Sequence, residues 1–245
     1  MSWCCATVST VALGENRYRE LRPPRSAGVL TCVWSRSVAL DAPAYRVVPD
    51  GCVDVIFSGD ALLVAGPDTT HHATTMRGEL VGARFLPGAG SAVLGVGMHA
   101  LRDARIELAE VWPAARVRVL TERLAEAGAV HGQRILAEAL TTEEPVLDPI
   151  VPGVRALAAR QRPVAEIADA VGFGERQLHR RCLDAFGYGA KTLTRVLRFH
   201  RALARARDGV DLARVAHDCG YADQAHLARE VRELAGAPLS TLRAE

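Results

Sequence analysis

The sequence predicts an α+β protein with a β-rich N-terminal barrel or sandwich, trailing helices, and then an all-α domain. Three observations support this fold class. Short apolar runs alternate with turn signals up to about residue 88, at a spacing of about ten residues. Apolar residues then recur at three- and four-residue intervals, which is typical of helices. Finally, the last third of the chain contains one short pattern twice, which predicts two helix-turn-helix units joined by a long helix.

Strands are expected where short runs rich in β-branched and apolar residues are bounded by Gly, Pro or Asp. Residues 1–26 are polar and predict no clear element, although two prolines favour an extended path there. Pro49-Asp50-Gly51 is a turn signal, and Pro87-Gly88 ends the last apolar run. The expected strands are residues 29–34, 45–48, 52–57, 61–65 and 79–85.

The pattern changes to helical periodicity near Gly97. Helices are expected over residues 101–111, 114–127 and 131–140. Residues 141–152 are rich in proline and acidic residues, which is typical of a linker. The predicted domains are therefore residues 1–140 and 153–245.

The duplicated pattern occupies residues 165–187 and 213–236. Ile167 corresponds to Val215 and Gly172 to Gly220, in each case 48 positions apart. After these glycines the corresponding residues are 49 positions apart, so the second copy has one extra residue after its turn. Each copy predicts a short helix, a Gly-containing turn and a longer helix. This is a helix-turn-helix, whose second helix can enter the major groove of DNA.

Seven helices are expected in this domain, over residues 154–161, 164–170, 175–185, 190–207, 212–218, 223–235 and 239–242. Asp211 is a suitable N-cap for the fifth of them. The 18-residue central helix would span about 27 Å. That length is comparable with the roughly 34 Å between successive major-groove segments on one face of a duplex.

Four-residue spacing places Leu178, Cys182 and Phe186 on the core side of the first long helix. Leu227, Val231 and Leu234 form the equivalent stripe in the second copy. The other faces are candidates for contact with DNA bases, because Arg pairs with guanine, Gln pairs with adenine, and Ala suits the thymine methyl group. The alternative is that these are ordinary solvated faces. The candidate base-contacting residues are Arg176, His179, Arg180, Gln224, Ala225 and Arg229.

The central helix carries a row of arginines at Arg198, Arg201 and Arg205, which share one side. Contact with DNA phosphates and plain solvent exposure are the two alternatives for this row. Net charge favours a nucleic-acid partner only for the C-terminal part. The whole chain carries +2, but residues 1–149 carry −3 and residues 150–245 carry +5.

Residues 153–242 resemble the DNA-binding domain of the AraC/XylS family of transcription regulators. The resemblance rests on Gly172-Phe173, Leu178-His-Arg-Arg, Phe186-Gly187-Tyr188, Leu197-Arg-Phe199, Gly220-Tyr221 and Gly236-Ala-Pro238. It implies two helix-turn-helix units joined by a long helix, with the candidate residues above as two sets of base contacts. The chain differs from the family at Cys182, Leu227 and Val231, where aromatic residues are usual, but all three are still apolar.

The N-terminal part resembles the β-rich domain that precedes this unit in actinobacterial regulators. Val48-Pro-Asp-Gly-Cys-Val-Asp-Val-Ile-Phe57 and Val81-Gly-Ala-Arg-Phe-Leu-Pro-Gly88 support this resemblance. Small barrels often hold a ligand, so a small-molecule effector site is one expectation. Its candidate residues are Trp34, Asp54, His71, His72 and Arg84. The alternatives are that Asp54 projects outward, that Trp34 belongs to the core, and that the domain mediates dimerisation without a ligand.

An enzyme is the rival class. A DNA-repair methyltransferase, or another modification protein, would use a reactive cysteine from Cys4, Cys5, Cys32 or Cys52. None of these lies in a Pro-Cys-His-Arg setting, and neither a Gly-x-Ser-x-Gly motif nor a P-loop occurs. Two adjacent histidines without further Cys or His nearby make a weak metal site. The sequence therefore predicts neither catalysis, nor a cofactor, nor a bound metal.

The predicted function is sequence-specific transcription regulation. The expected partners are double-stranded DNA, with RNA polymerase and a small-molecule effector as further candidates, and the chain is expected to be a monomer or homodimer. No apolar run is long enough to span a membrane, and the first residues lack the order of a signal peptide. Six cysteines without Cys-x-x-Cys spacing fit a reduced, cytoplasmic setting.

Overall fold

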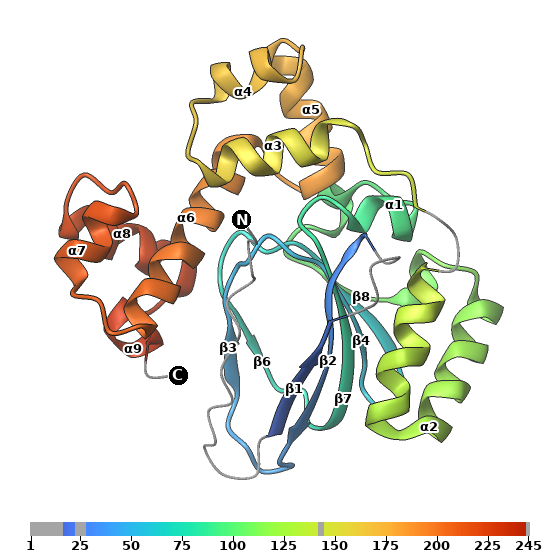
Figure 1. The fold of residues 1–245 in the computed structure, drawn as a ribbon. Helices are drawn as coiled ribbons and strands as arrows, with labels where there is room; N and C mark the ends of the chain where they lie inside the picture. Colours follow the sequence, from blue (N-terminus) through green and yellow to red (C-terminus); the bar gives the residue numbers. More distant parts are fainter. Residues whose placement is uncertain (1–16, 23–27, 142–144, 244–245) are drawn as a thin grey trace.

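A computed structural model of the chain describes residues 17–22, 28–141 and 145–243. An antiparallel β-sheet domain is followed by a helical region, so the predicted α+β class is confirmed (Figure 1). Expectations for residues 1–16, 23–27 and 142–144 lie outside the described residues. No helix among the described residues is both long and apolar enough to cross a membrane.

The N-terminal domain is built on a six-stranded antiparallel sheet with the strand order β1-β2-β7-β4-β5-β8. β3 and β6 pair separately as a two-stranded ribbon. The strands of the sheet are β1 (Arg17–Leu21), β2 (Leu30–Val38), β4 (Asp54–Phe57), β5 (Leu62–Ala65), β7 (Gly78–Phe85) and β8 (Arg105–Glu107). Those of the ribbon are β3 (Tyr45–Val47) and β6 (His72–Thr74). All five predicted strands are present, whereas β1, β6 and β8 were not predicted.

The two faces of the sheet have different partners. Helix α2 (Ala114–Thr141) packs on β7 and β2, while the β3–β6 ribbon lies on the other side of the sheet (Figure 1). Leu124 and Leu136 on α2 are almost fully buried against the sheet. Gly128 interrupts α2 with a left-handed φ of 65°. The predicted helices 114–127 and 131–140 are therefore the two halves of one broken helix.

The predicted helix over residues 101–111 is wrong. This segment forms the end of the 3-10 helix η1 (Met98–Leu101), then β8, then the 3-10 helix η2 (Leu108–Glu110). Asp103 adopts a left-handed φ of 56°, which stops helix propagation, and β8 then pairs with β5. A second difference is the short helix α1 (Gly90–Leu94), for which no helix was expected.

The C-terminal region consists of helices that closely match the expected ones. They are α3 (Ile150–Ala159), α4 (Val164–Ala170), α5 (Glu175–Phe186), α6 (Ala190–Arg207), α7 (Leu212–Asp218), α8 (Gln224–Ala235) and α9 (Leu239–Leu242). Helix α3 begins four residues earlier than predicted. Pro152 does not prevent this, because the first turn of a helix needs no backbone donor.

The two copies of the pattern form units of the same construction. Helices α4 and α7 each have seven residues, and α5 and α8 each have 12. The extra residue of the second copy lies in the turn between α7 and α8. Asp211 caps α7 by accepting hydrogen bonds from the backbone NH groups of Ala213 and Arg214, which confirms its predicted role.

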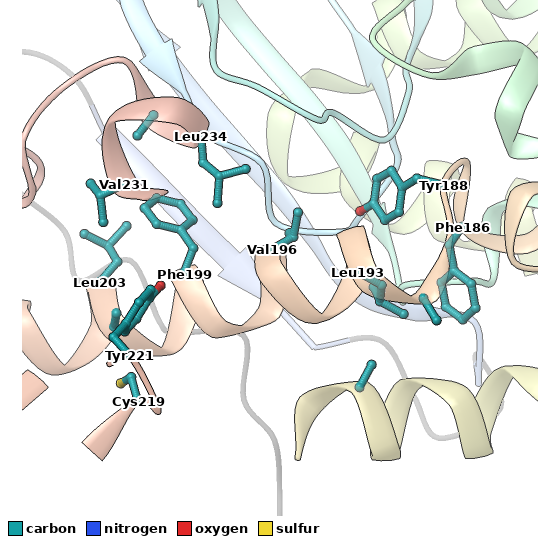
Figure 2. Packing of buried hydrophobic residues seen from close by; sticks show 14 of the residues in the cluster. Phe186, Tyr188, Leu193, Val196, Phe199, Leu203, Cys219, Tyr221, Val231 and Leu234 are labelled. Atoms are coloured by element: carbon teal, nitrogen blue, oxygen red, sulfur yellow. The ribbon is translucent and has the colours of Figure 1, made fainter. Parts of the chain in front are cut away.

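Helix α6 runs between the two units and contributes to one continuous apolar core (Figure 2). Leu193 lies near Phe186 at the end of the first unit, while Phe199 and Leu203 pack toward Val231 of the second. Because these side chains are at most 2% exposed, the central helix is fixed to both units by burial.

Candidate nucleic-acid interface and N-terminal pocket

Helix α5 presents its candidate base-contacting residues to solvent. Leu178 and Cys182 are fully buried and Phe186 is 1% exposed, so the opposite faces of α5 point outward. Arg176, His179 and Arg180 are all exposed. The helix begins without a side-chain cap, at Gly174. The first unit therefore combines a buried stripe with an accessible basic face.

Helix α8 repeats this arrangement. Leu227, Val231 and Leu234 are at most 2% exposed. Gln224, Ala225 and Arg229 are exposed. Asp223 caps the helix by accepting a hydrogen bond of 2.6 Å from the backbone NH of His226. The start of α8 is therefore fixed next to its exposed face.

Arg180 and Arg229 occupy the same place in the two units, two residues after the buried Leu178 and Leu227. Within the part of the chain that the structure describes, neither guanidinium has an ion-pair partner. Both are available to an external acceptor. His179 is more restricted, because its ring lies against the backbone of Gly189, where an added Cβ would lie 2.7 Å from Nδ1.

Two of the three arginines in the α6 row, Arg198 and Arg205, form ion pairs inside the protein. Arg198 is 15% exposed and donates to Glu230 through Nε at 3.0 Å and Nη2 at 2.5 Å. Its guanidinium also lies 4.4 Å from the ring centroid of Tyr221. Arg201 is half-buried, and Arg205 pairs with Asp218. Arg198 therefore binds an internal carboxylate, whereas its sequence position suggested either phosphate contact or solvent exposure.

Glu230 was not identified from the sequence, although a signal was present. It lies between Leu227 and Val231 on the buried stripe of α8, where a charge requires a partner. Burial acts to raise the pKa of the Glu230 carboxyl, but hydrogen bonds from Arg198 and Arg195 outweigh it and hold the pKa below its ordinary value. A charge at a core position of the helical pattern thus indicates the ion pairs that fasten α8 to α6.

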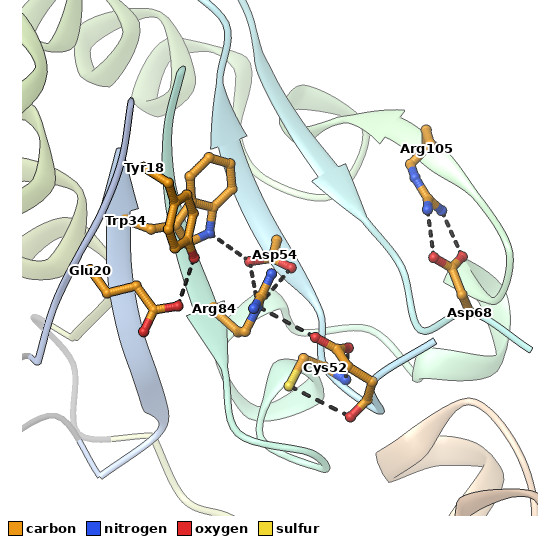
Figure 3. Close-up of polar contacts among 9 residues, drawn as sticks. Tyr18, Glu20, Trp34, Cys52, Asp54, Asp68, Arg84 and Arg105 are labelled. Carbon is orange, nitrogen blue, oxygen red and sulfur yellow. Dashed lines mark hydrogen bonds and ion pairs between the residues drawn. The ribbon is translucent and has the colours of Figure 1, made fainter. Parts of the chain in front are cut away.

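A cavity of about 420 Å³ lies in the N-terminal domain, lined by the inner face of the sheet and by the β3–β6 ribbon. Trp34 on β2 crosses over Gly82 on β7, where an added Cβ would lie 2.2 Å from the indole ring. Glycine is therefore required at that position, because any side chain would collide with the indole. Tyr18 packs against Trp34 with ring centroids 6.1 Å apart, which gives the cavity an aromatic wall (Figure 3).

Asp54 and Arg84 form the polar centre of this cavity (Figure 3). The Nε of Arg84 lies 3.2 Å from Oδ1 of Asp54 and 3.5 Å from Oδ2 of Asp50. The indole Nε1 of Trp34 donates to Asp54 at 2.9 Å. Burial raises the pKa of the Asp54 carboxyl, and the Arg84 charge opposes this shift. Asp54 therefore faces the cavity, which excludes the alternative that it projects outward.

The candidate effector residues are only partly brought together. Trp34, Asp54, His72 and Arg84 line the cavity, but His71 instead packs against Gly236. Sequence reasoning missed a second ion pair in the wall, in which Arg105 donates to both carboxylate oxygens of Asp68 at 2.8 and 2.6 Å. Arg36 also lines the cavity, and its guanidinium lies 3.9 Å from the ring centroid of Tyr45.

The four described cysteines lie in the protein interior. Cys32, Cys52, Cys182 and Cys219 are all buried. Burial raises the pKa of the Cys182 thiol to about 11, which disfavours the nucleophilic thiolate. Cys4 and Cys5 lie outside the described residues. No group of three or more metal-ligating side chains occurs among the residues that the structure covers.

Two family models match separate parts of the chain. Residues 167–245 match the model described as "Helix-turn-helix domain", and residues 20–107 match "Domain of unknown function (DUF6597)". The C-terminal region is therefore a helix-turn-helix domain, as the duplicated pattern predicted. No curated protein matches the chain.

Solved structures that match the chain include ToxT from Vibrio cholerae O395, at 9% identity and a TM-score of 0.44. That match covers 86% of this chain and 95% of ToxT. Unsaturated fatty acid-bound wild-type ToxT from Vibrio cholerae strain SCE256 matches at 11% identity and a TM-score of 0.45, covering 94% of this chain and 97% of that one.

Proposed function

We propose that this chain is a sequence-specific transcription regulator of the AraC/XylS type, whose two helix-turn-helix units bind two segments of the DNA major groove. The observation that carries the proposal is the repeated exposed face of α5 and α8 on one helix-turn-helix domain. Each helix buries an equivalent stripe and exposes, at the same place, an arginine that has no ion-pair partner among the described residues. A protein that uses both units needs no second copy to contact two groove segments.

In this proposal the two helices contact bases through different side chains. Arg176, His179 and Arg180 act from α5, and Gln224, Ala225 and Arg229 act from α8. Arginine binds guanine in a bidentate manner and glutamine binds adenine, so the two units would recognise different half-sites. Arg201, which is half-buried on α6, is a candidate for phosphate contact between the half-sites.

Replacing Arg180 or Arg229 with alanine is expected to weaken DNA binding by about 1–3 kcal/mol, each at a different base position. The physical reason is the loss of a bidentate contact to a base edge. Equilibrium binding to duplexes with single base-pair changes measures this effect. Arg118→Ala, on an exposed face of α2, is the matched control and should bind as the unchanged chain does. Equal losses on every duplex would instead assign both arginines to phosphate contacts.

We further propose that the N-terminal cavity holds a small-molecule effector. Its volume of about 420 Å³, its aromatic wall and its polar centre fit a compact ligand with both a flat apolar part and polar ends. Ligand-induced stabilisation provides the test, because a ligand of the folded state raises Tm. A compound that stabilises the chain and the Trp34→Ala variant equally binds elsewhere.

A further inference from the structure

The loop between β5 and β6 faces the cavity on one side and the helix-turn-helix domain on the other. Gly66 and Asp68 of the loop, and His72 at its end, line the cavity. Pro67, Thr70 and His71 contact the C-terminal domain. A single short segment therefore borders both functional regions.

The loop meets the first unit at the end of α5. Gly187 ends that helix in a left-handed conformation with φ 82°. A Cβ added to Gly187 would lie 2.5 Å from Cγ of Pro67 and 3.1 Å from the carbonyl oxygen of Met98. The backbone of the first unit is therefore in direct contact with the N-terminal domain, with no space for a side chain between them.

The same loop meets the second unit at the equivalent position. Gly236 corresponds to Gly187 in the duplicated pattern and ends α8 with φ 66°. A Cβ added there would lie 2.3 Å from Cε1 of the His71 ring. The hydroxyl of Thr70 also donates to the backbone carbonyl of Glu233 at 3.3 Å. One loop thus contacts the last turn or terminal cap of both base-contacting helices.

Two carboxylates fix the conformation of the loop. Asp103 accepts hydrogen bonds from the backbone NH of Thr69 at 2.6 Å and from its hydroxyl at 2.8 Å. Asp68 accepts hydrogen bonds from Nη1 and Nη2 of Arg105, in a pair that forms part of the cavity wall. These hydrogen bonds hold the middle of the loop to the N-terminal domain, next to its contacts with the C-terminal domain.

We propose that residues 67–71, here called the brace, hold the two base-contacting helices at a fixed separation, and that a ligand which engages the Asp68–Arg105 pair changes DNA binding through the brace. The brace adds to other connections between the units, among them helix α6 and the hydrogen bond of 2.9 Å from Gln161 to the carbonyl of Cys219. The effect on DNA rests on the proposed function above, whereas the effect on helix separation does not.

The distance between two spin labels tests the brace without DNA. Gln177 on α5 and Arg232 on α8 are exposed, and each can be replaced by a keto amino acid that takes a spin label without involving the native cysteines. We expect a narrow distance distribution in the otherwise unchanged chain and a broader one in the Pro67→Gly/His71→Ala variant. Asp60→Ala, in the exposed turn between β4 and β5, should leave the distribution unchanged.

A matched pair of glycines separates contact with the brace from backbone strain. Gly187→Ala and Gly172→Ala both place alanine at a left-handed φ, of 82° and 75°, but nothing lies within 4 Å of an added Cβ at Gly172. The brace predicts a shifted distance for Gly187→Ala alone. Arg105→Gln, which removes the bidentate pair to Asp68, should also broaden the distance distribution. An unchanged distribution in this variant would show that the Asp68–Arg105 pair of the cavity wall does not act on the two helices through the brace.

Binding to DNA with one base pair inserted between the half-sites gives the functional outcome. The discrimination is the ratio of the affinity for the original DNA to the affinity for the DNA with the insertion. We expect this ratio to fall at least about fivefold in the Pro67→Gly/His71→Ala variant. An unchanged spin-label distance in this variant overturns the brace, even if the chain binds DNA specifically. A broadened distance in a chain without sequence-specific DNA binding supports the brace and refutes the proposed function instead.

Discussion

Replacing Arg84 with alanine is expected to lower the free energy of unfolding by about 2–4 kcal/mol, because two carboxylates would lose their shared counter-charge. Arg84 is 20% exposed and Asp54 14% exposed, and they lie together in the cavity with Asp50. Removing one partner of a largely buried pair costs more than the pair contributes, since the remaining charge stays poorly solvated. Chemical denaturation of the full chain measures the change.

Two controls make the Arg84 prediction specific. The side chain of Arg118 is 68% exposed and pairs with Glu122. Replacing Arg118 with alanine should lower the free energy of unfolding by less than about 1 kcal/mol. Combining Arg84→Ala with Asp54→Asn should cost less than the two single changes added together, because the second change removes the orphaned charge. If Arg84→Ala is no more destabilising than Arg118→Ala, the ion pair does not organise the cavity.

Glu230→Ala is expected to destabilise the second helix-turn-helix unit by about 2–4 kcal/mol. The Glu230 side chain is 6% exposed, and it accepts hydrogen bonds from Arg195 at 3.1 Å and from Arg198 at 3.0 and 2.5 Å. Alanine would leave both guanidiniums without this acceptor. Glu166→Ala, at a carboxylate 57% exposed and 3.9 Å from Arg162, is the control and should have little effect.

The pH dependence of stability follows from the same carboxylate. The pKa of Glu230 is below its ordinary value in the folded protein, so its contribution is present above the unfolded-state pKa. That contribution is lost as the pH falls through the folded-state pKa. Glu230→Gln should therefore show a weaker loss of stability between about pH 5 and pH 3 than the unchanged chain. Identical slopes would show that Glu230 gains no net stabilisation from the two arginines.

The helical domain could be predicted from the sequence because its signals are local. The spacing of Leu178, Cys182 and Phe186 defines the buried face of α5, and the one-residue change in offset after Gly220 places the longer turn. Asp211 marks the start of α7 by its capping chemistry. The buried stripe and the helix cap depend only on residues within a few positions of one another, and the longer turn follows from comparing the two copies of the pattern.

The cavity and the arginine pairs could not be predicted because they depend on contacts between distant segments. Arg198 meets Glu230 only after α8 has packed on α6, so its spacing on α6 alone suggested an external partner. Asp68 and Arg105 meet because β8 pairs with β5, and β8 lies in a segment predicted to be helical. Charged residues within apolar strands, such as Asp54 and Arg84, were the available signal for internal pairing.

Selection of bound sites from random duplex DNA by the full chain is the most direct test of the central claim. The account predicts an enriched asymmetric motif with two different halves about 10 base pairs apart. The selection is then repeated with the Arg180→Ala and Arg229→Ala variants. Each variant should lose sequence preference in the half of the motif that its own helix contacts, and keep it in the other half. A pool with no enriched motif would contradict the assignment of α5 and α8 as base-contacting helices.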